Sequence, residues 1–159
     1  MAYIEEKGLQ ENGCIFEAAK EKKHDRKSLL LYRNGSTVVL LNRFPYTNGH
    51  LLLAPERHIS DISELMPDEG TALFAMIQDS VAILRQHLKP DGFNIGLNLG
   101  PEAGAGCPGH LHFHIVPRWA GDHNFMTVLA EVRTIPEHID RTFDRLLPDF
   151  QKLLKPYGK

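Results

Sequence analysis

Three histidines near residue 110 form the pattern in this sequence with the clearest chemical potential. His110, His112 and His114 are separated by single apolar residues, Leu111 and Phe113. Side chains alternate between the two faces of a β-strand, so this spacing predicts a strand that presents three imidazoles on one face, each about 7 Å from the next. A purely structural alternative is a polar strand face on which the histidines only pair with their neighbours.

The spacing of the histidines favours covalent catalysis over a three-histidine metal site. Along one straight strand the outer imidazoles lie about 14 Å apart, so at most two could reach one zinc ion through bonds of about 2 Å. Covalent catalysis fits better, because a neutral imidazole can attack phosphorus and form a labile phosphoramidate while a second one protonates the leaving oxygen. His112 is the natural nucleophile, since it has a histidine on each side.

The loop that precedes the histidines offers a place for phosphate. Residues 100–109 contain four glycines, and such a loop can bring backbone N–H groups close to phosphate oxygens. The spacing of Gly104, Gly106 and Gly109 matches the dinucleotide-binding fingerprint only formally, because that fingerprint opens a helix and this loop opens a strand. A plain flexible turn is the alternative.

Strands dominate the elements that must position these residues. Five are expected: four over residues 29–33, 37–41, 50–54 and 93–98, and the histidine strand, which follows Gly109. The first two are joined by Asn34-Gly35, which is typical of a type I′ turn. A further strand or extended segment is expected over 125–132. We expect the five strands to form a largely antiparallel sheet.

Two longer helices are expected, one before the strand at 93–98 and one near the C-terminus. Apolar periodicity predicts a long helix from Pro67 to about Leu88, and a C-terminal helix within 136–155 that bends or breaks at Pro148. A short helix is also expected over 14–22. The order of strands and helices indicates an α+β fold.

Composition places the chain among ordinary globular domains. It has 159 residues, 42% of them hydrophobic, and a net charge of −2. We expect one domain over 1–159, with a loose lead-in at 1–12 and a C-terminal helical extension at 136–159. The charge gives no support for binding to nucleic acid or a membrane surface, and no apolar run could span a bilayer. Two cysteines and no signal-peptide pattern favour a reducing, cytoplasmic setting.

The histidine pattern and its surroundings resemble a known family. The run from His110 to Val116 resembles the signature of the histidine triad (HIT) superfamily, in which three histidines alternate with apolar residues. Residues 42–52 and 55–58 look like the family's substrate-side strand and the segment that follows it. Residues 100–104 are similar to the fragile-histidine-triad branch, and residues 117–125 resemble bacterial members related to diadenosine tetraphosphate phosphorylases.

This resemblance implies a HIT-like fold and a nucleotide-cleaving enzyme that needs no cofactor for its chemistry. The implied substrates are dinucleoside polyphosphates such as diadenosine tetraphosphate, cleaved at the α-phosphate through a nucleotidyl-histidine intermediate. His112 would attack phosphorus, and His114 would bind phosphate oxygens and assist the leaving group. His110 would support the site by hydrogen bonding, and His50 would orient the nucleophile. A homodimer and an adenine-containing substrate are also implied.

Two other functions remain open at this point. One is hydrolysis of nucleoside phosphoramidates or other mononucleotide conjugates, which differ in the leaving group. The other is a nucleotide-binding signalling module in which catalysis is slow or unimportant.

The resemblance also implies nucleotide contacts outside the histidines. Asn42 would hold the ribose and Asn98 the α-phosphate. Candidate walls for the base, with core packing as the alternative, are Ile15, Phe16 and Phe44. The fragile-histidine-triad branch has a glutamine where this chain reads Ala105-Gly106-Cys107. Gly106 and Cys107 are therefore candidates for the phosphate side, and small-residue packing is equally open for Cys107.

A metal site is the last implication. Many bacterial members have a Cys-x-x-Cys pair that joins two histidines in a structural zinc site, and here the pair reads Cys14-Ile15-Phe16-Glu17. Because glutamate also ligates zinc, Cys14, Glu17, His58 and His110 are a candidate four-ligand set, weakened by the loss of one thiolate. The alternative is a region that packing alone stabilises.

Overall fold

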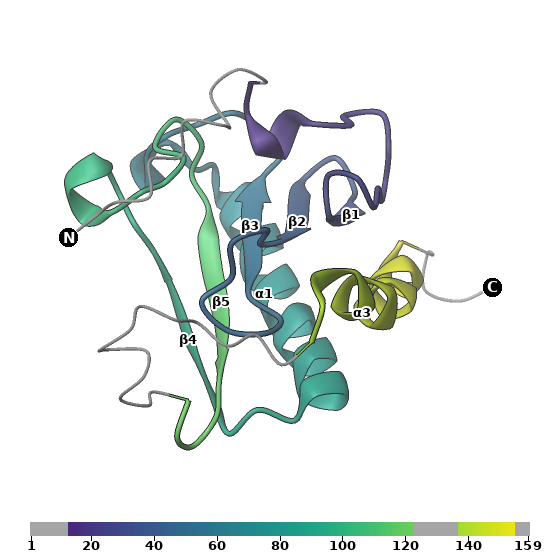
Figure 1. Ribbon diagram of the computed structural model, residues 1–159. Helices are drawn as coiled ribbons and strands as arrows, with labels where there is room; N and C mark the ends of the chain where they lie inside the picture. Colours follow the sequence, from purple (N-terminus) through teal and green to yellow (C-terminus); the bar gives the residue numbers. More distant parts are fainter. Residues whose placement is uncertain (1–12, 123–136, 155–159) are drawn as a thin grey trace.

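A five-stranded antiparallel sheet is the centre of the fold (Figure 1). The computed structural model describes residues 13–122 and 137–154. The strands are β1 (Leu30–Arg33), β2 (Thr37–Leu41), β3 (Leu51–Pro55), β4 (Gly92–Leu97) and β5 (Phe113–Arg118). They lie in the order β1-β2-β3-β5-β4, and every neighbouring pair is antiparallel. The α+β class and the five-stranded sheet are therefore as the sequence predicts.

Two helices pack on one face of this sheet. They are α1 (Pro67–Leu88), which begins with its proline in the first turn, and α3 (Ile139–Leu153). Strand residues such as Leu31, Val39 and Leu53 pack with Phe143 and Leu146 of α3 in the main core. Among the described residues, no helix is long and apolar enough to cross a membrane.

The opposite face of the sheet is covered by the N-terminal segment. The short 3₁₀ helix η1 (Ile15–Glu17) inserts Phe16 into a second cluster with Leu30, Leu40 and Leu52. Two further 3₁₀ helices are η2 (Ile62–Glu64) and η3 (Pro101–Ala103). Because β2 and β3 are buried on both faces, their sequences are continuous apolar runs instead of alternating ones.

Two predictions about the N-terminal third were wrong. No helix spans 14–22, because η1 ends at Glu17 and the carbonyls of Phe16 and Ala18 accept hydrogen bonds from Arg33 instead of from helical N–H groups. The turn between β1 and β2 is not type I′, which needs positive φ at both central residues. Only Gly35 has a positive φ there, while the Asn34 carboxamide accepts from the N–H groups of Ser36 and Thr37.

The C-terminal helix also differs from expectation. α3 runs through Pro148 without a break; Pro148 and Asp144 are both exposed, so the Asp144 carbonyl that loses its N–H donor lies on the solvent side of the helix. The segment 125–132, the lead-in 1–12 and the last residues of the predicted extension lie outside the described residues.

Candidate active site

His112 and His114 are closer together than a single strand would place them. β5 begins at Phe113, so only His114 lies in the strand, and the prediction that all three histidines lie on one strand was wrong. The reason is that the Leu111 N–H donates to the carbonyl of Ile59, 2.6 Å away, which draws the chain before Phe113 out of the sheet. The ring centroids of His112 and His114 are 5.0 Å apart, shorter than the expected 7 Å.

His50, which directly precedes β3, forms a hydrogen-bonded pair with His114 of β5. The N–H of Tyr46 donates to His50 Nδ1 at 3.1 Å, so the neutral His50 ring carries its proton on Nε2. That Nε2–H donates to His114 Nδ1 at 2.9 Å. His114 therefore holds its own proton on Nε2. Burial, together with the nearby charge of His112, lowers the pKa of His114 to about 4, so this ring is neutral at pH 7.

His112 has the opposite arrangement of its two nitrogens. Its Nδ1 lies 2.8 Å from the carbonyl of His110, which can only accept a hydrogen bond. The neutral His112 ring must therefore carry its proton on Nδ1, and Nε2 holds the lone pair. A nucleophilic nitrogen is thereby fixed in orientation by the backbone of the preceding histidine.

The Nε2 atom of His114 is a donor that the protein leaves unused. It is buried and has no hydrogen-bond partner among the residues that the structure describes. An unpaired buried donor is costly, so such atoms commonly mark functional sites. His112 and His114 together therefore present a lone pair beside an N–H donor, as attack on a phosphate group requires.

The loop before β3 surrounds His50 with further polar and aromatic groups. Asn42 donates from Nδ2 to His50 Nδ1 at 3.3 Å, and its Oδ1 accepts from the N–H of Phe44. Phe44 is exposed, as is Tyr46, whose ring lies 4.8 Å from that of His50 and is stacked over His114 at 6.3 Å. Sequence analysis missed Tyr46, although its place between Asn42 and His50 was a usable signal.

Phe16 supports the histidines from beneath. Its side chain is only 1% exposed, and its ring centroid lies 4.9 Å from that of His110 and 5.2 Å from that of His112. Ile15 is partly buried against the same cluster. Both positions favour core packing over contact with a base, while the exposed Phe44 keeps the base-wall prediction open.

The glycine-rich loop is braced by Asn98 and contacts the N-terminal segment. Asn98 Nδ2 donates to the carbonyl of Gly104 at 3.3 Å, and Gly106 is exposed. The half-buried thiol of Cys107 is hydrogen-bonded to Cys14, and this contact is the largest cause of a Cys14 pKa lowered to about 4. The sequence gave no indication that the two cysteines would meet.

Three of the four candidate zinc ligands lie together. One ligand atom each from Cys14, His58 and His110 all fall within 4.8 Å of one another, with Cys14 Sγ 3.1 Å from His110 Nδ1. His110 Nε2 donates to the carbonyl of Pro55, which leaves Nδ1 as the nitrogen able to bind metal. A thiolate and two imidazoles suit zinc, which there would tie η1 to the histidine row.

Glu17 lies at the margin of this group. Its carboxylate forms an ion pair with Lys20 at 2.8 Å and lies 3.5 Å from His58 Nδ1. Burial alone lowers the pKa of His110, but hydrogen bonds with Cys14 and the Pro55 carbonyl, together with the charges of Cys14 and Glu17, raise it above its ordinary value overall.

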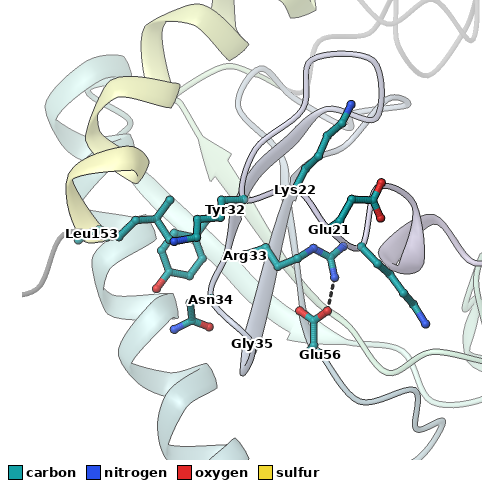
Figure 2. Close-up of a pocket in the computed structure, with 11 residues that line it drawn as sticks. Glu21, Lys22, Tyr32, Arg33, Asn34, Gly35, Glu56 and Leu153 are labelled. Atoms are coloured by element: carbon teal, nitrogen blue, oxygen red, sulfur yellow. Dashed lines mark hydrogen bonds and ion pairs between the residues drawn. The ribbon is translucent and has the colours of Figure 1, made fainter.

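A cavity of about 600 Å³ lies apart from the histidines, between β1 and the end of α3. Figure 2 shows Arg33 directed toward Glu56 in its wall, and the two form an ion pair. Arg33 also donates to the carbonyl of Phe16 at 2.6 Å. The side chain that lines this cavity therefore fixes η1, and with it the ring beneath His112.

The fold and the site define a class of proteins in which an antiparallel sheet carries a hydrogen-bonded row of histidines. A family model described as "HIT domain" matches residues 23–121, and the chain belongs to this family. The resemblance inferred from the sequence is thereby confirmed.

Comparison with individual proteins identifies relatives in bacteria and yeast. The chain is 38% identical over 130 residues to the "AP-4-A phosphorylase" of Mycobacterium tuberculosis, a match that covers 82% of this chain and 63% of that protein. The chain thus spans less than two thirds of that relative. It is 32% identical over 95 residues to the "Bis(5'-nucleosyl)-tetraphosphatase [asymmetrical]" of Schizosaccharomyces pombe, covering 60% of this chain and 52% of that protein.

A solved structure supports the fold. A zinc-bound histidine triad family protein from Mycobacterium smegmatis aligns with a TM-score of 0.63 and 27% identity, covering 79% of this chain and 85% of that one.

Proposed function

We propose that this protein cleaves dinucleoside polyphosphates, with diadenosine tetraphosphate as the representative substrate, at the α-phosphate through a nucleotidyl-His112 intermediate. The observation that carries the proposal is the adjacency of the His112 lone pair and the unpaired, buried His114 Nε2–H. The names of the bacterial and yeast relatives support the substrate class.

The reaction proceeds in two displacements. His112 Nε2 attacks the α-phosphorus, a P–N bond forms, and the bond from phosphorus to the leaving nucleotide's oxygen breaks. His114 donates its Nε2–H to a phosphate oxygen as negative charge develops there. Because the pKa of His114 is about 4, it makes this hydrogen bond as a neutral ring at pH 7. Water or inorganic phosphate then attacks phosphorus, and the P–N bond breaks to regenerate His112.

The identity of the second nucleophile distinguishes a hydrolase from a phosphorylase. Purified protein is incubated with diadenosine tetraphosphate, with and without inorganic phosphate, and the products are separated by ion-exchange chromatography. ATP and phosphate-dependent ADP would indicate a phosphorylase. ATP and AMP, formed equally without phosphate, would indicate a hydrolase. Failure to cleave under both conditions would contradict the proposed substrate class.

Replacing the nucleophile tests the mechanism. His112→Ala should lower kcat by at least about 10³-fold, because no neighbouring group can replace a covalent nucleophile. His24→Ala is the matched control, since His24 is exposed and hydrogen-bonds Gln151. Mass spectrometry of acid-free quenched protein should find an AMP adduct on the wild-type peptide that contains His112. Turnover retained in His112→Ala would disprove the mechanism.

We also propose that the protein is a homodimer that pairs through β4. Within the described part of the chain, β4 is an edge strand bonded to β5 alone. Its residues Asn94, Ile95 and Gly96 are exposed, and Ile95 is a large apolar side chain with 46% of its surface accessible. An uncovered edge strand is a ready site for pairing with a second chain.

A cytoplasmic location is a further part of the proposal. Neither Cys14 nor Cys107 is part of a disulfide, as is typical of a reducing compartment. Fractionation of cells that express the tagged protein would test the location.

A further inference from the structure

The two cysteines of the chain meet beside the histidine row. Cys107 lies in the glycine-rich loop and Cys14 at the start of η1, yet their side chains are hydrogen-bonded to each other. Neither is part of a disulfide. A second thiol therefore stands next to the group formed by Cys14, His58 and His110.

A backbone turn joins Cys107 to His110, a member of this group. The N–H of His110 donates to the carbonyl of Cys107 at 3.3 Å, which closes a turn over two intervening residues. Zinc ligands are commonly separated by two residues, because such a turn brings both side chains to one side. Gly106 and Gly109 flank the turn and allow the loop to bring the Cys107 sulfur nearer the imidazoles.

We propose that Cys107 is the fourth ligand of a structural zinc site whose other ligands are Cys14, His58 and His110. The donor set is then two thiolates and two imidazoles, which is typical of closed structural zinc sites. Ligand atoms around a tetrahedral zinc ion lie about 3.3–3.8 Å apart. Cys14 Sγ and His110 Nδ1 are 3.1 Å apart, and the ligand atoms of Cys14, His58 and His110 all lie within 4.8 Å of one another. Both values are close to this range.

Glu17 is the competing candidate for the fourth position. Its carboxylate is already paired with Lys20 at 2.8 Å, and it lies 3.5 Å from His58 Nδ1. A cysteine also restores the thiolate that the Cys14-x-x-Glu17 pair lacks. Glu17 is better placed as a partner that orients His58.

The proposed site would connect the phosphate-side loop to the N-terminal segment. Cys107 belongs to the loop 100–109, whereas Cys14 adjoins η1, whose Phe16 supports His112. Zinc would therefore hold the loop beside the nucleophile. The proposal stands apart from the assignment of substrate, because it rests on the metal ligands alone.

Cobalt substitution counts the thiolates directly. Reduced apoprotein is titrated anaerobically with Co²⁺, and the sulfur-to-cobalt charge-transfer absorption in the near ultraviolet is measured. The wild-type protein should show the charge-transfer absorption expected for two cobalt–thiolate bonds, together with the visible bands of a tetrahedral Co²⁺ ion. Cys107→Ser and Cys14→Ser should each halve the charge-transfer absorption. Cys107→Ser should also weaken zinc binding at least about 10-fold in a chelator competition.

Glu17→Gln is the matched control, because it removes a carboxylate from the same neighbourhood without changing side-chain volume. It should leave the charge-transfer absorption unchanged. Circular dichroism of each apoprotein shows whether the variants are folded. A Cys107→Ser protein with undiminished absorption, or a wild-type protein that binds no Co²⁺ or Zn²⁺, would overturn the proposal. Neither result would bear on the diadenosine tetraphosphate assay, which reports on His112.

Discussion

At the residue scale, hydrogen bonds to backbone groups determine which nitrogen of each histidine carries the proton. The Tyr46 N–H and the His110 carbonyl fix His50 and His112 respectively, and His50 then fixes His114. The histidine spacing alone predicts a reactive group but not these roles. The roles depend on Tyr46 and on the departure of residues 110–112 from the strand, neither of which a local pattern encodes.

The low pKa of His114 should make folding stability depend on pH. The unfolded chain binds a proton at this residue below pH 6.5, whereas the folded protein does so only near pH 4. The contribution of neutral His114 to folding stability is therefore fully present above pH 6.5, and it is lost as the pH decreases toward 4. Protonation of His114 should lower the free energy of unfolding by roughly 2–3 kcal/mol between pH 7 and pH 4.5.

Urea denaturation of wild type and His114→Asn at both pH values checks this contribution. The variant lacks the titrating ring, so its free energy of unfolding should decrease less on acidification. Equal decreases in the two proteins would show that His114 is not the group responsible.

At the element scale, the strands were predictable where burial alone determined them, and the N-terminal segment was not. β2 and β3 are apolar runs that any arrangement of this core would bury. The 14–22 segment has apolar residues at helical spacing, but the buried Arg33 takes two of its carbonyls and Phe16 fills the open face of the sheet. These contacts join residues distant in sequence, so local periodicity does not reveal them.

Gly49 controls how the strand that follows His50 packs against α1. Its φ is +77°, and a Cβ atom there would lie 2.3 Å from Leu88 Cδ1 and 3.3 Å from Leu84 Cδ2. Gly49→Ala should therefore lose about 1–2 kcal/mol from the left-handed backbone and about 1–3 kcal/mol more from the clash. Gly35→Ala, with φ of +89° and open space around it, should lose only the backbone part.

Thermal or urea unfolding of the two glycine variants separates the effects. Equal losses of stability would show that the Leu88 and Leu84 side chains move aside without cost, and that the close approach of Gly49 to α1 does not constrain the fold.

At the scale of the whole molecule, the family and the sheet were predictable because the histidine signature and the order of elements are both encoded in sequence. The family match over residues 23–121 confirms the first, and the strand order confirms the antiparallel sheet. The contact of Cys14 with Cys107 was not predictable. It depends on the fold placing η1 and the glycine-rich loop on the same side of the histidine row.

The proposed dimer should be sensitive to one side chain on β4. Ile95→Lys places a charge on the exposed edge strand, and repulsion between two such strands should convert a dimer into monomers. Sedimentation equilibrium of wild type and variant measures this change. Phe74→Lys, which adds the same charge at an exposed apolar side chain of α1, controls for the added charge. A monomeric wild-type protein would contradict the dimer.

The pairing of β3 with β5 has a consequence for how the chain folds. The hydrogen bond between His50 and His114 joins residues 64 positions apart, so it forms only after a long loop has closed. The β1–β2–β3 meander is local and needs no such closure, and contacts of large sequence separation slow folding. The single tryptophan, Trp119, directly follows β5 and is a natural fluorescent reporter of this step. His50 and His114 are thus brought together by the contacts that are kinetically the most demanding in the sheet.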